Sequence, residues 1–172
     1  MDLKSFISIV PDFPEEGISF KDITTLLQNG EALKYTIDQF KELTRDMHVD
    51  LILGPEARGF ILGTALAYAL GIGFVPLRKP GKLPRKTVKK NYSLEYGNDS
   101  LEIHSDAIKK GQSVLIVDDL LATGGTLCTS MKLVEKLEGK VEGIFTLIVL
   151  ADLKGREKLE GYNVQSLITY PY

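Results

Sequence analysis

Short apolar runs alternate along this chain with longer runs of helical character, and this alternation restricts the fold more than any other feature. Buried strands are predicted at residues 49–53, 74–77, 114–117, 144–150 and 164–168. Helices are predicted at residues 32–47, 60–70 and 127–137. Buried strands separated by helices of this length form βαβ units. The pattern therefore predicts an α/β fold with a mostly parallel central sheet and helices on both faces.

The segment between residues 78 and 104 interrupts this alternation. Residues 78–90 hold seven basic side chains and no acidic one, and their glycine and prolines make this run a poor helix. Residues 89–95 and 100–104 are predicted to pair as a β-hairpin, with a glycine-bearing turn at residues 96–99. We therefore expect a flexible loop followed by a hairpin.

Composition narrows the class of protein. A chain of 172 residues with 44% hydrophobic and 26% charged side chains is long enough for one domain with a sizeable core. The net charge of -2 argues against a general nucleic-acid binder. The single cysteine, Cys128, excludes an intramolecular disulfide and favours a reducing compartment. With no signal peptide or membrane span expected, the predicted location is cytoplasmic.

Residues 114–126, with the sequence VLIVDDLLATGGT, combine two kinds of ligand-binding group. Two adjacent carboxylates follow an apolar strand, and carboxylates accept hydrogen bonds from ribose hydroxyls. Two threonines and two glycines then precede a helix, whose N-terminal N–H groups and dipole bind phosphate. The segment therefore predicts a site for a sugar phosphate. Its residues are Asp118, Asp119, Ala122, Thr123, Gly124, Gly125 and Thr126.

Two common nucleotide-binding motifs do not fit this segment. It lacks the lysine of the P-loop, and no G-x-G-x-x-G follows a strand, because Gly71-Ile72-Gly73 precedes one. The alternative without a ligand is a solvated strand end followed by a helix cap. His48 and His104 are isolated in the sequence and are expected at the surface, so no cluster for a transition metal is predicted.

Four segments resemble those of a known family, the type I phosphoribosyltransferases, and the resemblance covers nearly the whole chain. VLIVDDLLATGGT resembles the family's signature for phosphoribosyl pyrophosphate (PRPP). FPEEGISFKDITTLL (residues 13–27) is similar to its base-binding segment, and GPEARGF (54–60) to its pyrophosphate loop. RKPGKLP (78–84) and YSLEYG (92–97) are similar to its catalytic loop and hairpin. The resemblance implies one domain over residues 1–172, with a base-binding hood at about 1–30 and a flexible hairpin lid at about 79–104.

The resemblance also implies an activity. The 5-phosphoribosyl group of PRPP would be transferred to adenine, giving AMP and pyrophosphate, as in purine salvage. The residues of the ATGGT and YSLEYG segments favour adenine as the acceptor base. One alternative is transfer to another base, such as xanthine, guanine or orotate. The other is a PRPP-sensing regulator without catalysis, which would be expected to carry an added DNA-binding segment.

Roles for individual residues follow from the resemblance. It implies that Asp118 and Asp119 act in catalysis together with Arg58 and the lid glutamate, Glu95, and that Tyr96 also belongs to the lid. It implies that adenine is bound by Ser19, Phe20 and Lys21. It implies a pyrophosphate site formed by Glu56, Ala57, Arg58, Arg78, Lys79 and Lys82.

Further features are implied in the same way. The family suggests a cis peptide between Glu56 and Ala57, and a homodimer. Mg²⁺ would be bound mainly through PRPP and water, without a dedicated protein cluster. Two positions depart from the family's pattern, with Lys21 where arginine is common and Pro55 where isoleucine or leucine is usual. Lysine keeps the charge at the first position but loses the bidentate fork.

Overall fold

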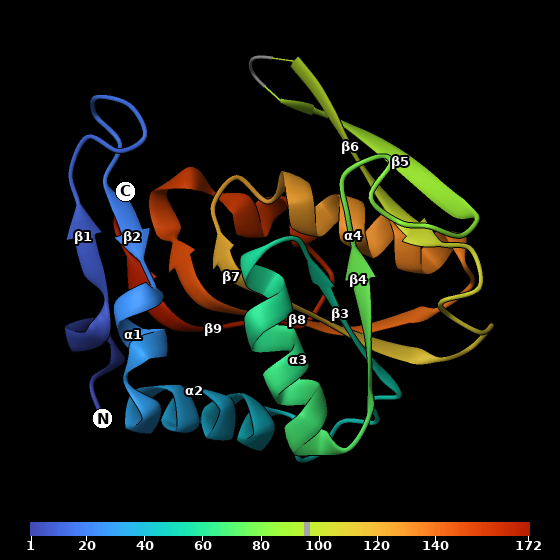
Figure 1. The fold of residues 1–172 in the computed structure, drawn as a ribbon, viewed down its shortest axis with the longest axis horizontal. Helices are drawn as coiled ribbons and strands as arrows, with labels where there is room; N and C mark the ends of the chain where they lie inside the picture. Colours follow the sequence, from blue (N-terminus) through green and yellow to red (C-terminus); the bar gives the residue numbers. More distant parts are fainter. Residues whose placement is uncertain (95–96) are drawn as a thin grey trace.

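A parallel sheet forms the centre of the molecule (Figure 1). The computed structural model describes residues 1–94 and 97–172, and in these ranges the sheet has five strands in the order β4-β3-β7-β8-β9. All four neighbouring pairs are parallel. The strands are β3 (Leu51–Pro55), β4 (Gly73–Leu77), β7 (Ser113–Leu121), β8 (Lys140–Leu150) and β9 (Val164–Tyr170). The five predicted strands and their parallel arrangement are confirmed.

Helices cover both faces of the sheet, as predicted. Alternate residues of the central strand β7 enter two different cores, because successive side chains of a strand point to opposite faces. Leu115 and Val117 pack in the core that holds the apolar side chains of α2 and α3, whereas Val114 and Ile116 pack in the core of α4. The helices are α1 (Thr24–Gln28), α2 (Gly30–Leu43), α3 (Arg58–Leu70) and α4 (Gly125–Lys136).

Two small antiparallel sheets lie outside the central one (Figure 1). β1 (Ser8–Val10) pairs with β2 (Phe20–Asp22) in the hood. β5 (Thr87–Leu94) pairs with β6 (Gly97–His104) in the hairpin. The predicted hairpin is therefore present. Residues 97–99 were predicted to lie in its turn, and this prediction is wrong. Those residues belong to β6 because the strand pairing continues to the last described residues on each side, 94 and 97.

Other differences concern element ends and burial. β7 continues to Leu121, four residues beyond the predicted end, because β8 pairs with it throughout that stretch. The acidic pair thus lies inside the strand and not after it. His104 is only 9% exposed, so its predicted surface position is wrong; its Nε2 accepts a hydrogen bond from the Arg85 N–H. Short 3-10 helices at Leu3–Phe6, Ala151–Leu153 and Gly155–Leu159 were not predicted.

Two glycines allow the start of α3 to lie close against the ends of β3 and β7. A Cβ added at Gly54 would lie 2.7 Å from the Gly59 carbonyl oxygen. A Cβ added at Gly59 would lie 2.9 Å from Cδ of Pro55 and 3.0 Å from Oδ1 of Asp118. Since real Cβ atoms do not approach other atoms so closely, these positions set the distance between α3 and the carboxyl ends of both strands.

Replacing Gly54 with alanine is expected to destabilise the fold. The added Cβ would push the Gly59 backbone away from β3, and overpacking of this kind costs about 1–3 kcal/mol of unfolding free energy. Gly30→Ala is the matched control, because a Cβ at Gly30 meets no atom within 4 Å; its unfolding free energy should stay within about 0.5 kcal/mol of wild type. Urea unfolding of both variants gives the comparison. Equal stabilities would show that the close approach is not required.

Candidate functional site

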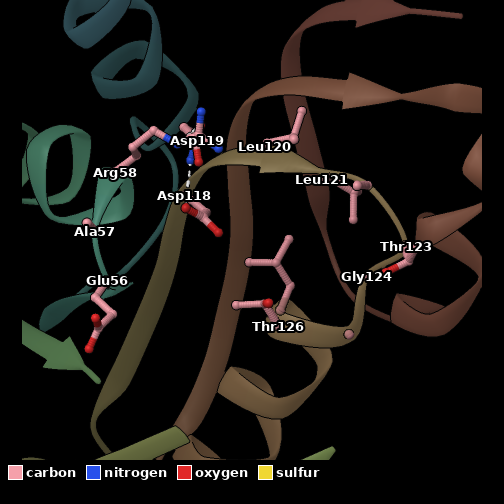
Figure 2. A pocket seen from close by; sticks show the side chains of 13 residues that line it. Glu56, Ala57, Arg58, Asp118, Asp119, Leu120, Leu121, Thr123, Gly124 and Thr126 are labelled. Carbon is pink, nitrogen blue, oxygen red and sulfur yellow. Dashed lines mark hydrogen bonds and ion pairs between the residues drawn. The ribbon is translucent and has the colours of Figure 1, made fainter. Parts of the chain in front are cut away.

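The carboxyl ends of β3 and β7 border a cavity of about 260 Å³ (Figure 2). Residues 56–58 line it from the β3–α3 connection, and residues 118–127 line it from the end of β7 and the start of α4. Ligands of open parallel sheets bind at this end of the strands. The structure therefore brings together the two segments predicted to bind pyrophosphate and sugar phosphate, which lie about 60 residues apart in the chain.

The two carboxylates of the acidic pair lie at the edge of this cavity. Asp119 is only 5% exposed. Oδ1 of Asp118 accepts a hydrogen bond of 2.8 Å from the Asp119 N–H. Burial, and next the charge of Asp119, raise the pKa of Asp118 well above its ordinary value. Burial also raises the pKa of Asp119, although the Arg58 guanidinium opposes that rise. The pair is thus held where full negative charge is unfavourable unless a cation or hydrogen-bond donor is added.

Arg58 connects the acidic pair to the hood. It is the first residue of α3, and its Nε lies 3.0 Å from Oδ2 of Asp119. Its guanidinium carbon also lies 5.1 Å from the ring centre of Phe20, within the range of a cation–π contact. The peptide between Glu56 and Ala57, just before this helix, is cis as the resemblance implied. Arg58 therefore contacts both an acid of the cavity and the aromatic ring at the hood.

Glu56 ties the basic loop to the same region. Its carboxylate accepts hydrogen bonds of 3.2 Å from Arg78 Nε and 2.8 Å from the Lys79 N–H. The Lys79 ammonium is ion-paired with Asp99 of β6. Lys82 is exposed and has no ion pair within residues 1–94 and 97–172. Of the predicted pyrophosphate residues, Glu56 and Arg78 are thus joined directly, and Glu56, Ala57 and Arg58 line the same cavity.

Gly124 and Gly125, at the start of α4, are surrounded differently. Gly124 caps α4 with a φ of 83°, in the left-handed region, and a Cβ there would lie 2.6 Å from the Gly155 carbonyl oxygen. A Cβ on Gly125 would meet nothing closer than the Tyr92 ring at 3.6 Å. A side chain at Gly125 would therefore point toward Tyr92 without a clash, and the backbone of Gly125 also lines the cavity. No feature of the sequence indicates that Gly155 packs against Gly124.

A second cavity, largely apolar in its lining and of about 260 Å³, lies in the hood. Its lining residues are Val10, Phe13, Phe20 and Asp22. The rings of Phe13 and Phe20 meet edge to face, with centres 5.2 Å apart. Sequence analysis singled out Phe20 and missed Val10 and Phe13, although Phe13 begins the segment that resembled a base-binding one. The Lys21 side chain faces away from this cavity and is 8% exposed.

Some predicted features fall outside what the structure describes. Glu95 and Tyr96 are not among the described residues.

Within the described ranges, no group of three or more His, Cys, Asp or Glu side chains is placed to hold a metal ion. In the same ranges, no helix combines the length and the apolar character needed to cross a membrane.

Comparison with known proteins agrees with this geometry. Residues 22–169 match the family described as the phosphoribosyl transferase domain. The chain therefore belongs to the phosphoribosyltransferase family. Within it, two relatives that match over nearly the full length are adenine phosphoribosyltransferases. One from Clostridium botulinum (strain Eklund 17B / Type B) is 64% identical, and one from Clostridium perfringens (strain SM101 / Type A) is 58% identical; each match covers 99% of both chains.

Solved structures confirm the predicted type I phosphoribosyltransferase fold. The adenine phosphoribosyltransferase of Thermoanaerobacter pseudethanolicus is 54% identical, with a TM-score of 0.96 over 98% of each chain. The enzyme from Giardia lamblia, solved in complex with 9-deazaadenine, is 36% identical, with a TM-score of 0.92 over 99% of this chain and 97% of that one.

The raised pKa of Asp118 predicts a pH-dependent effect of Asp118→Asn. Below the ordinary carboxyl pKa of about 3.9, Asp118 is protonated in both the folded and the unfolded state. As the pH rises through the higher folded-state pKa, the wild type loses stability, because the unfolded chain ionises more readily. Asparagine keeps the shape without the charge, so the variant should be the more stable protein at neutral pH, and this advantage should vanish towards about pH 3.

Thermal unfolding between pH 3 and 8 checks this prediction. Asp106→Asn is the control of opposite sign, because the hydrogen bond from Arg85 lowers the pKa of the exposed Asp106. Its small loss of stability should appear at neutral pH and disappear in acid. A stability advantage of Asp118→Asn that is independent of pH would exclude the burial of charge as its cause.

Proposed function

We propose that this chain transfers the 5-phosphoribosyl group of PRPP to adenine, giving AMP and pyrophosphate in purine salvage, and that residues 1–172 act as one phosphoribosyltransferase domain. One observation carries the proposal. The buried acidic pair, the open N-terminus of α4 and Arg58 all border a single cavity. The names of the full-length relatives support adenine as the acceptor.

The 5-phosphate is proposed to bind at the start of α4. Backbone N–H groups of the loop would donate to its oxygens, where the helix dipole adds favourable charge. The hydroxyls of Thr123 and Thr126 would add two further donors. The loop consists of Ala122, Thr123, Gly124, Gly125 and Thr126, all of which line the cavity.

Asp118 and Asp119 are proposed to hold the ribose and to stabilise the transition state. The two ribose hydroxyls would donate to the carboxylates. As the bond between C1 and pyrophosphate breaks, positive charge develops on the sugar. A ring nitrogen of adenine forms the new bond to C1 and releases its proton to solvent or to the departing pyrophosphate. Because burial makes the charge of the pair unfavourable in the free protein, its attraction to a cationic sugar should be strongest in the transition state.

The leaving pyrophosphate is proposed to bind between the β3–α3 connection and the basic loop. Backbone groups of Glu56 and Ala57 would contact it, and Arg58 and Arg78 would donate paired hydrogen bonds. Lys79 and Lys82 would add positive charge. Arg58 and Lys79 each contact a carboxylate in the structure, so both would exchange that partner for the pyrophosphate.

Mg²⁺ is proposed to bind mainly through the oxygens of PRPP and through water. The carboxylate oxygens of Asp118 and Asp119 at the cavity fit a cation that prefers oxygen ligands and few protein contacts. When bound, the ion would neutralise part of the charge on the leaving group. We also propose a cytoplasmic homodimer without nucleic-acid or membrane partners.

Adenine is proposed to bind in the hood, stacked on Phe20, with backbone groups near Ser19 facing its edge. The apolar lining of the hood cavity supports this placement. The resemblance assigns the lid glutamate, Glu95, a place near the purine and includes Tyr96 in the lid; both assignments remain predictions.

The decisive experiment is an assay of AMP formation from adenine, PRPP and Mg²⁺. The proposed function requires turnover that depends on all three. A protein that binds PRPP in calorimetry but forms no AMP would instead be a PRPP-sensing protein, and the enzymatic proposal would be wrong.

Gly125→Val should weaken PRPP binding while the fold survives. The backbone of Gly125 has space for a side chain, and it lines the cavity in which the 5-phosphate is proposed to bind. The affinity for PRPP measured by calorimetry should fall more than about tenfold. Gly30→Val, also at a position where a Cβ meets no atom within 4 Å, is the control and should bind PRPP as the wild type does. Unchanged binding by Gly125→Val would place the phosphate elsewhere.

The base should be selected by its hydrogen-bonding pattern. Adenine presents an amino donor at position 6 and an acceptor at N1, and 6-oxopurines present the reverse. Each unpaired buried group costs about 1–3 kcal/mol, so kcat/KM for adenine should exceed that for hypoxanthine by at least about a thousandfold. Phe20→Ala should lower kcat/KM for both bases and leave their ratio intact, because every purine has a π-face. Competition assays test both statements, and comparable turnover of the two bases by the wild type would contradict the assignment of adenine.

A further inference from the structure

Lys21 is a buried cation whose side chain lies away from the proposed substrates. It is the middle residue of β2, between Phe20 and Asp22, which both line the hood cavity. Successive side chains of a strand point to opposite faces. Lys21 therefore points away from the cavity, and its residue is 8% exposed.

The Lys21 ammonium donates two hydrogen bonds to the same residue, Ser19. Its Nζ lies 2.9 Å from the Ser19 carbonyl oxygen and 2.7 Å from the Ser19 hydroxyl. It also lies 5.3 Å from the ring centre of Tyr170, the last residue of β9. Throughout residues 1–94 and 97–172, no carboxylate lies within ion-pair distance of Lys21. Ser19 and the aromatic ring are thus the groups that stabilise this charge.

A buried charge is retained in a fold only where hydrogen bonds and nearby π-systems compensate for lost water. Burial lowers the pKa of Lys21, in keeping with this environment. The consequence for Ser19 is that its carbonyl and its hydroxyl both accept a hydrogen bond from one ammonium group, which restrains the orientation of both. Ser19 comes directly before Phe20, the residue proposed to stack on the base. A fixed Ser19 peptide therefore fixes the start of the strand that borders the base.

We propose that Lys21 is a positioning residue for base selectivity and acts through the carbonyl of Ser19. This inference rests on the proposed function. A carbonyl oxygen has two lone pairs. Lys21 occupies one and holds the other in place for the exocyclic amino group of adenine. A 6-oxopurine brings an oxygen to that position, and two acceptors that face each other cannot form a hydrogen bond. The more precisely the Ser19 carbonyl is positioned, the larger is the difference in binding free energy between adenine and a 6-oxopurine.

The chain offers a matched control in Lys4. Its ammonium lies 5.1 Å from the same Tyr170 ring centre, but it is exposed and makes no hydrogen bond to Ser19. Lys4→Met removes a cation from the ring and leaves the contacts of Lys21 with Ser19 intact. An effect of Lys21→Met that is absent from Lys4→Met is therefore not a general effect of charge at Tyr170.

The experiment compares steady-state kinetics with adenine and hypoxanthine for the wild type, Lys21→Met, Lys21→Arg and Lys4→Met. Lys21→Met is expected to raise KM for adenine about tenfold, which corresponds to about 1.4 kcal/mol. The ratio of kcat/KM between adenine and hypoxanthine should fall by a similar factor. KM for PRPP and kcat at saturating adenine should change less than about twofold, because Lys21 touches neither the sugar nor the phosphate site. Lys21→Arg keeps a charged donor and should recover most of the selectivity.

A double-mutant cycle with Ser19→Ala tests whether Lys21 acts through Ser19. Because the carbonyl remains in Ser19→Ala, this variant alone should lose less than about threefold in kcat/KM for adenine. Added to Lys21→Met it should cause no further loss, since the hydroxyl then has no ammonium to hold. Independent, additive losses would separate the two residues and overturn the mechanism.

Other outcomes also decide the matter. Unchanged KM and selectivity in Lys21→Met would overturn the inference, as would an equal loss for adenine and hypoxanthine accompanied by a lower thermal midpoint. If Lys21→Met does not fold, Lys21→Gln provides the same comparison with an uncharged polar side chain. The proposed function is judged separately: if the wild type forms no AMP from adenine and PRPP, that function is wrong. If it forms AMP and the variants match it, only the role of Lys21 fails.

Discussion

Two carboxylates at the buried end of a parallel strand place the strongest constraint on this structure. Asp118 and Asp119 lie where burial raises the pKa of both. A fold tolerates such a pair only if positive charge or hydrogen-bond donors lie near it. Arg58 at the start of α3 supplies the charge, and the start of α4 lies across the same cavity. The close approach of α3 to β3, which the glycines at 54 and 59 permit, is therefore a requirement of the site as well as of the core.

Arg58 also links the hood to the central sheet. Its guanidinium contacts Asp119 on one side and the Phe20 ring on the other. The second link is the Lys21 ammonium, which joins Ser19 of the hood to Tyr170 at the end of β9. Two cations thus attach a small, otherwise exposed pair of strands to the sheet, one on each face of β2. The hood cavity gains its position from these contacts, because a two-stranded sheet is marginally stable by itself.

Periodicity and local motif predicted the features that depend on neighbouring residues. The five strands and the three long helices followed from apolar spacing, and the position of the cavity-lining loop at residues 122–126 followed from glycines placed between a strand and a helix. Contacts between distant segments were not predictable in this way. The contact of Lys21 with Tyr170, the packing of Gly155 against Gly124 and the burial of His104 all depend on how separate elements meet. The end of β7 was placed too early because charged residues suggest a strand end, whereas pairing with β8 continues past them.

The charges of the site compensate one another in the structure, and this has a consequence for ligand binding. Arg58 is paired with Asp119, Arg78 with Glu56, and Lys79 with Asp99. A ligand that offered only phosphate groups would draw Arg58 away and leave Asp119 buried without its counter-charge, which is unfavourable. A ligand that carries both phosphates and ribose hydroxyls provides a new partner for the cation and new donors for the carboxylate at once. The Arg58–Asp119 pair would therefore favour a ligand that carries both phosphates and ribose hydroxyls over one that carries phosphates alone, because only the first offers a new partner to each member of the pair.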